Sequence, residues 1–212
     1  NLMRILSRWP HMTRSGLCLQ IAATLLIAPQ LDAQRSTTRG WSLGVIAQGT
    51  SLSVEDGDAS SGGSLGLRVG YGFNRIVTGF IHVDGGLIDV GEGAALSGKW
   101  SLSHGEIGAR FHFANSLKRV VPFLETSVGG RVVTVEDARS NGTSAGKVNF
   151  NGGAFTLGGG LAAYFKPTLA LDVGVKFTSG KFTEVDLGNV AVRNLDIDAT
   201  SFRFGVGLVW WP

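Results

Sequence analysis

The sequence is poor in cysteine, in charged residues and in long apolar runs. Cys18 is its only cysteine, so residues 34–212 have no disulfide bond and no thiol for catalysis or metal binding. Charged residues make up 17% of the chain, below the average of about 25%. No apolar run reaches the roughly 18 residues that a membrane-spanning helix needs. These scarcities exclude a disulfide-stabilised domain, a cysteine-based active site and a membrane-spanning helix.

The charge balance gives no support for nucleic-acid binding. The formal net charge is +3, but Arg4, Arg8 and Arg14 lie in the N-terminal segment, where Asp32 is the only acid. The remaining residues carry a net charge of about +1, so no basic surface for a nucleic acid is expected.

The first 33 residues have the composition of a cleaved secretory signal peptide. The three arginines form a basic region, residues 17–28 form an apolar stretch, and Ala33 precedes a candidate cleavage site. This interpretation predicts export of the chain and leaves residues 34–212 as a single domain.

Glycine, in contrast, is abundant, with 32 of the 212 residues, about twice the usual share. It alternates with larger apolar residues, which is the two-residue period of half-buried strands. The clearest case is the segment 201–211, SFRFGVGLVWW, where Phe202, Phe204 and Trp210 share one face. Eight such segments are predicted, at residues 41–47, 65–72, 77–84, 104–113, 123–131, 155–165, 169–177 and 201–211.

The connections between these segments alternate in length. Those near 73–75, 114–119 and 166–168 are short, whereas 51–63, 85–98, 135–150 and 179–199 are long and polar. Outer-membrane barrels have short periplasmic turns and long external loops, so both termini are predicted to be periplasmic. We therefore predict an all-β fold, an eight-stranded antiparallel up-and-down transmembrane β-barrel. Two further strands within 179–199 would give the alternative of ten strands, and residues 181–185 and 190–197 also have the pattern of a hairpin that extends the last two strands.

Aromatic residues on the apolar face gather at one predicted rim, on the side of the short connections. This is where outer-membrane barrels have their periplasmic aromatic girdle. The predicted girdle consists of Trp41, Tyr71, Phe111, Phe113, Phe165 and Trp210. The interior of an eight-stranded barrel is just filled by side chains, and the glycine-rich face fits it better than large apolar residues do. The apolar face is therefore predicted to contact lipid, in preference to lining a soluble exported barrel.

The chain resembles the small bacterial outer-membrane β-barrels of the OmpA and OmpX type over residues 40–211. The resemblance is carried by the closing segment FRFGVGLVWWP, the PFLETSVGG stretch at 122–130 and the leader. It implies residence in the bacterial outer membrane, contact with outer-membrane lipid, and assembly by the insertion machinery that recognises a terminal aromatic strand.

The face opposite the apolar one carries charges of both signs. An unpaired buried charge costs several kcal/mol, so we predict ion-pair layers that fill the lumen. Arg110 and Glu125, which face each other across the turn at 114–119, are the most specific pair. The predicted network consists of Arg68, Glu106, Arg110, Glu125, Arg131, Asp172, Lys176 and Arg203.

A second arrangement of interior residues has the composition of a metal site. His82, Asp84, His104 and Glu106 lie near adjoining ends of two neighbouring strands, and these residue types bind zinc or another divalent cation. The long connection between the strands leaves their register open. Hydrogen-bonded polar filling is favoured, and no metal or cofactor is expected.

Several functions are compatible with this barrel. We favour a monomer with a structural or surface-interaction role, whose long loops contact an external ligand or protein. A small ion or solute channel is the alternative, because interior glycines would leave gaps. A lipid-modifying enzyme would use Ser103, His104 and Glu106, but the neighbours Ser103 and His104 leave opposite faces of a strand, so no enzymatic activity is predicted.

Overall fold

The computed structural model describes residues 38–55, 59–90, 97–113, 119–140, 143–187 and 190–212. The predicted signal peptide and most of the connection at 114–119 lie outside the described residues. The strands are β1 (Gly40–Val54), β2 (Ser60–Gly72), β3 (Val77–Asp89), β4 (Ser97–His112), β5 (Val120–Ser140), β6 (Thr143–Lys166), β7 (Leu169–Leu187) and β8 (Val190–Trp210). No helix among the described residues is long and apolar enough to cross a membrane.

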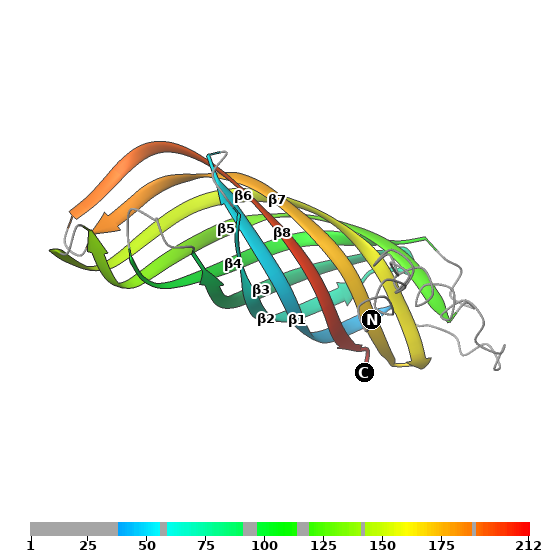
Figure 1. Ribbon diagram of the computed structural model, residues 1–212. Coiled ribbons are helices and arrows are strands. Elements are labelled where there is room, and N and C mark those ends of the chain that lie inside the picture. The colour runs from blue at the N-terminus through cyan, green and yellow to red at the C-terminus, as the bar shows by residue number, and fades with distance from the viewer. Residues whose placement is uncertain (1–37, 56–58, 91–96, 114–118, 141–142, 188–189) are drawn as a thin grey trace, which may run out of the picture. The chain divides into compact units, whose positions relative to one another are not determined.

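The eight strands form one closed antiparallel ring (Figure 1). Each strand pairs with its neighbour in sequence, and β8 pairs with β1 from Leu43 opposite Trp210 to Val54 opposite Ala199. The predicted eight-stranded barrel is confirmed. The alternative of ten strands is wrong for the described residues, because 179–199 lengthen β7 and β8 and add no new strand. We call the end that holds the start of β1 and the end of β8 the turn end, and the opposite one the hairpin end.

The later strands extend farther toward the hairpin end than the apolar alternation predicts. β5 has 21 residues, β6 has 24 and β8 has 21, more than the 9–11 or so that cross a bilayer. Most of 135–150 and 179–199, expected as loops, is therefore paired strand. Leu187 pairs with Val190 at the tip, which confirms the predicted hairpin.

Polar pairs between β7 and β8 explain why this extension lacks an apolar period. Lys181 Nζ lies 2.5 Å from Asp196 Oδ1, and Arg193 Nε donates to Glu184 Oε1 over 2.8 Å. The hydrogen bond with Asp196 raises the pKa of Lys181 above its ordinary value. Opposite charges on facing strands stabilise such a ribbon, although the sequence there lacks the apolar alternation used to predict strands.

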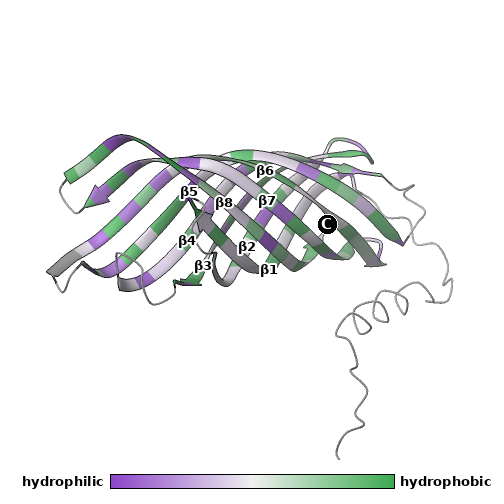
Figure 2. Ribbon diagram, turned by 45° about the horizontal axis from the view of Figure 1, so that its top comes forward, coloured by the Kyte–Doolittle hydropathy of each residue, from purple (hydrophilic) through white to green (hydrophobic). Residues whose placement is uncertain are grey.

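The outer face of the ring is apolar, and residues of opposite hydropathy alternate along the strands (Figure 2). The six aromatic residues predicted to form the girdle are all exposed, from Phe111 at 38% to Phe113 at 64%. The ring centroids of Trp41 and Tyr71 lie 5.3 Å apart, and Phe73 extends this contact with a centroid 5.5 Å from Tyr71. An exposed apolar band with aromatic residues at its rim is typical of a lipid-facing surface.

The interior has three layers, and two of them are apolar. Charged residues occupy the middle. The cluster at the turn end contains Val121, Phe123, Ala162, Tyr164, Ala170, Val209 and Trp211. The layer toward the hairpin end contains Leu52, Ile88, Leu102, Val133, Phe182 and Ala199. A further apolar cluster, which shares its contacts with Trp100 and Phe150, contains Val135, Ala138, Val148 and Val185. The alternation predicts a mainly small or charged inner face, so these two apolar layers are a finding of the structure.

Candidate functional site

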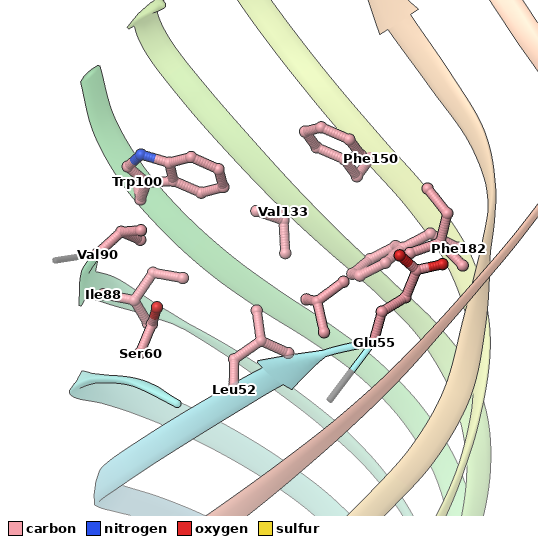
Figure 3. A pocket seen from close by; sticks show the side chains of 11 residues that line it. Leu52, Glu55, Ser60, Ile88, Val90, Trp100, Val133, Phe150 and Phe182 are labelled. Atoms are coloured by element: carbon pink, nitrogen blue, oxygen red, sulfur yellow. The ribbon is translucent and has the colours of Figure 1, made fainter. Parts of the chain in front are cut away.

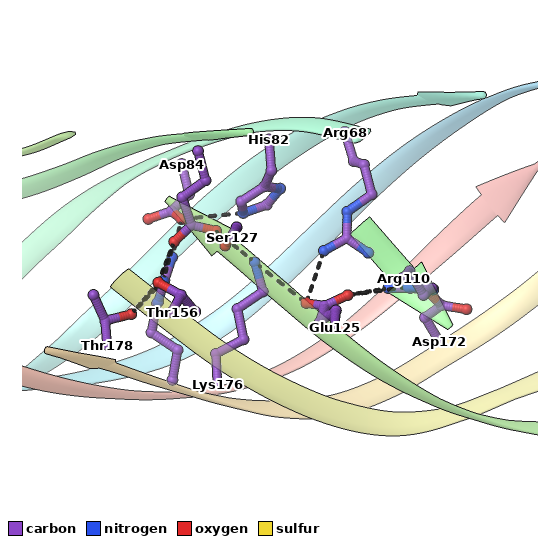
Figure 4. Close-up of polar contacts among 12 residues, drawn as sticks. Arg68, His82, Asp84, Arg110, Glu125, Ser127, Thr156, Asp172, Lys176 and Thr178 are labelled. Carbon is purple, nitrogen blue, oxygen red and sulfur yellow. Dashed lines mark hydrogen bonds and ion pairs between the residues drawn. The ribbon is translucent and has the colours of Figure 1, made fainter. Parts of the chain in front are cut away.

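The middle layer of the interior is a network of buried ionisable side chains (Figure 4). All eight residues of the predicted network lie in it or beside it, each no more than 7% exposed. They come from β2, β4, β5, β7 and β8. Alternate side chains of a strand point to the same face, and these residues occupy the positions that face into the ring.

Glu125 is the centre of the part nearer the turn end. It lies opposite Arg110 in the β4–β5 register, and Arg110 Nη2 is 2.9 Å from Glu125 Oε2. Arg68 Nη2 is 3.1 Å from the other carboxylate oxygen, and Lys176 Nζ is 3.5 Å from it. Arg110 also pairs with Asp172 on β7. One carboxylate thus connects cations from three strands.

Two aromatic rings support these arginines from the side. The Arg110 guanidinium carbon lies 3.7 Å from the ring centroid of Phe123, and that of Arg68 lies 4.4 Å from Phe80. Both rings are buried, so the guanidinium groups are held between carboxylates and aromatic faces.

Arg203 is the centre of the part nearer the hairpin end. Its Nη1 lies 2.6 Å from Asp84 Oδ2, and its Nη2 donates to Glu106 and, over 2.7 Å, to Thr178 Oγ1. Lys176 Nζ lies 3.0 Å from Glu106 Oε2 and so joins the two parts. The planar guanidinium group suits such a bridge, because it presents several donors in a fixed geometry.

The four residues considered for a metal site separate into two environments. His82 Nε2 lies 3.1 Å from Asp84 Oδ2, and His104 Nδ1 lies 3.0 Å from Asp84 Oδ1. Glu106 instead bonds to Lys176 and Arg203. In the part of the chain that the structure describes, no group of three His, Cys, Asp or Glu side chains is arranged to hold a metal ion. The two histidines act here as hydrogen-bond partners of Asp84.

The residues considered for an enzyme lie on both sides of the wall. Ser103 is exposed on the outer face and His104 is buried in the interior, as expected for neighbours in a strand. The two side chains are therefore unable to share a proton.

Arg131 is the predicted network residue that has no ion pair among the described residues. Its Nη2 donates to the Ala199 carbonyl over 3.0 Å, and its guanidinium carbon lies 4.7 Å from the ring centroid of Phe182. Its Nε and Nη1 have no hydrogen-bond partner among the described residues, although the side chain is fully buried.

Little free space remains around the network. The gap lined by Gln48, Arg68, Glu125, Lys176 and other interior residues has a volume of about 30 Å³.

The interior aromatic residues of the hairpin end are a finding of the structure. Trp100, Phe150 and Phe182 lie outside the predicted strand segments but within β4, β6 and β7. The inward alternation of Val133 with Val135 on β5 continues past the predicted end of that strand and is the signal that would have found the extension.

Comparison with known proteins agrees with this architecture. The family model of the outer membrane protein beta-barrel domain matches residues 19–209. No curated protein sequence matches the chain. The crystal structure of Neisserial surface protein A is similar, with a TM-score of 0.60 and 16% identity over 81% of this chain and 96% of that one.

Two further solved structures share the fold. Ail, the attachment invasion locus protein of Yersinia pestis, has a TM-score of 0.50 and 14% identity over 81% of this chain and 99% of its own. OprG from Pseudomonas aeruginosa has a TM-score of 0.50 and 14% identity over 84% and 99%. Since the family model covers nearly the whole closed ring, the chain belongs to the outer membrane protein beta-barrel domain family.

Proposed function

We propose that this protein is a monomeric, non-conducting barrel of the bacterial outer membrane whose hairpin end serves surface interaction. In this arrangement the turn end and both termini face the periplasm, and the girdle of Trp41, Trp210 and their neighbours lies at the periplasmic lipid interface. The insertion machinery and outer-membrane lipid are its partners during and after assembly. No catalytic role is proposed.

The observation that carries the non-conducting role is the way the charge network fills the ring. The gap within it is about 30 Å³, and seven ion pairs connect its charged side chains: Arg68–Glu125, Arg110–Glu125, Arg110–Asp172, Lys176–Glu106, Lys176–Glu125, Arg203–Asp84 and Arg203–Glu106. A hydrated ion would have to separate several of these pairs at once, and breaking one buried pair costs about 3–5 kcal/mol.

The interior glycines support the same interpretation and weaken the channel alternative. A Cβ built at Gly66 would lie 2.6 Å from Cε1 of His82, and one at Gly158 would lie 3.1 Å from Cγ of both Glu125 and Lys176. Neighbouring side chains therefore fill the space beside these two glycines, which would otherwise form gaps for a solute.

Conductance in a planar bilayer tests the proposal, using protein whose gel mobility shifts on boiling as a folded barrel's does. The unaltered protein should show no discrete openings. The double variant Arg110→Ser/Glu125→Ser removes two facing side chains from the network and should give openings. The matched variant Arg193→Ser/Glu184→Ser removes an exposed pair of the β7–β8 hairpin and should stay silent. Stable openings of the unaltered protein would refute the non-conducting role and favour the channel.

A further inference from the structure

An apolar pocket lies inside the hairpin end of the ring, with a volume of about 510 Å³ (Figure 3). Small-molecule sites have volumes of about 300–1,000 Å³ and mostly apolar walls with a few polar groups. Nine of its lining residues are apolar and two are polar, the latter being Glu55 and Ser60. The aromatic part of the wall is formed by Trp100, Phe150 and Phe182.

This wall belongs to the barrel itself, since nine of the eleven lining residues come from the paired strands. Leu52, Val133 and Phe182 are each no more than 4% exposed and form part of the apolar cluster nearer the hairpin end. The ring centroids of Phe150 and Phe182 lie 6.1 Å apart with a T-shaped contact. The pocket is therefore held by the hydrogen-bonded sheet, and the hydrocarbon of a ligand would meet a preformed wall.

An unpaired cation lies directly behind this wall. Phe182 lines the pocket and also stacks on the guanidinium group of Arg131, so one side chain separates the pocket from the charge. Arg131 has no ion pair among the described residues, and two of its nitrogens lack a hydrogen-bond partner. With the histidines counted as neutral, five buried cations of the interior face four buried carboxylates. The excess positive charge is thus located at Arg131.

We propose that this pocket binds a single-chain carboxylate, such as a medium-chain fatty acid, with the hydrocarbon against the aromatic wall and the carboxylate at Arg131. With the Phe182 ring displaced, the carboxylate accepts a hydrogen bond from Nε or Nη1, the two nitrogens that have no partner among the described residues. Pairing removes the cost of a buried uncompensated charge, and a charge-assisted hydrogen bond is about twice as strong as a neutral one. Glu55 at the pocket disfavours a carboxylate near its own oxygens, which favours binding with the head directed inward.

Calorimetric titration tests this site, with the full protein in lipid nanodiscs and empty nanodiscs as the reference for partition into the bilayer. The probes are octanoate, octan-1-ol and octyltrimethylammonium at neutral pH, which share one chain and differ in head group. Octanoate should bind saturably at one site and more tightly than the other two.

Variants then separate the head-group contact from the apolar wall. Arg131→Met and Arg131→Gln should each weaken octanoate binding by at least about tenfold, because a charge-assisted contact is lost, and should leave octan-1-ol unchanged. Ser60→Trp places a large ring in the pocket and should weaken all binding. Arg193→Gln alters an exposed arginine outside the pocket and is the matched control, with no change expected.

Several results would overturn the inference. One is octanoate binding that is no stronger than its partition into empty nanodiscs. Another is a folded Arg131 variant that binds octanoate as tightly as the unaltered protein does. A third is tighter binding of octyltrimethylammonium than of octanoate, which would indicate that Glu55 binds the head group. If neither Arg131 variant folds, carbon-13 NMR of carboxyl-labelled octanoate on the unaltered protein decides. If the carboxylate pairs with Arg131, bound octanoate should stay ionised at a pH at which free octanoate is protonated. If bound and free octanoate become protonated over the same pH range, the proposed pairing is refuted. Conductance and binding are measured separately, so failure of this inference leaves the non-conducting role standing.

Discussion

Arg203→Met should destabilise the barrel strongly, whereas Arg131→Met should not. Both arginines are fully buried in the interior, and both belong to the charged set expected from the sequence. Arg203 bridges Asp84 and Glu106, whereas Arg131 has no ion pair among the described residues. The same substitution at equal burial therefore isolates the contribution of pairing.

The structure sets the size of the difference. Without Arg203, Asp84 retains its hydrogen bonds to His82 and His104, and Glu106 retains Lys176. Asp84 then has no arginine or lysine partner among the described residues, and removal of one partner from a buried pair costs about 3–5 kcal/mol. Arg131→Met gives up one hydrogen bond to the Ala199 carbonyl, worth about 1.5–3 kcal/mol for a charged donor, and the contact with the Phe182 ring. Relief of an unpaired buried charge offsets part of this, so the net loss should stay below about 1.5 kcal/mol.

Urea unfolding in lipid vesicles, followed by tryptophan fluorescence and by gel mobility without boiling, measures both free energies of unfolding. Arg203→Lys is the intermediate control, because it keeps the positive charge and loses the forked donor geometry. Equal stabilities of the Arg203→Met and Arg131→Met variants would refute the argument that pairing determines the effect. A larger loss at Arg131 would show that Arg131 has a compensating partner.

Two further predictions concern the wall of the barrel. Gly129→Ala should lower the free energy of unfolding by about 1–3 kcal/mol, because the added Cβ would lie 1.9 Å from the Gly105 carbonyl oxygen. Gly105→Ala should have little effect, because its Cβ would meet no atom of the described residues within 4 Å. Equal urea midpoints of the two variants would contradict this. In vesicles of brominated lipid, Trp41 and Trp210, which are 62% and 48% exposed, should account for most tryptophan quenching, so their replacement by Phe should remove it. Trp211→Phe is the control, since Trp211 is 3% exposed and faces the interior. Quenching that depends on Trp211 would contradict the assignment of the apolar outer face to lipid.

The strand count and the outward face were predictable because both depend on a local pattern. A two-residue period records which side of a strand is apolar, and the segment with Phe202, Phe204 and Trp210 shows it without reference to any neighbour. Arg110 and Glu125 were also predictable as partners, since a short turn places adjoining strands in a narrow range of registers. The β7–β8 extension was less clear, because polar pairs such as Lys181 and Asp196 replace the apolar alternation there.

The sequence by itself determined that eight amphipathic strands with an apolar, aromatic-rimmed face would be formed. Every second residue of a strand lies on the same face, so the hydropathy of alternate residues shows which face is apolar. Only the tertiary structure decided which interior charges meet. Arg203 and Asp84 are 119 residues apart and pair across the lumen only after β8 closes on β1 and the register of every strand is set. The same closure leaves Arg131 beneath an apolar pocket without an ion pair among the described residues, because the depth of each side chain in the ring depends on the combined stagger of all eight strands.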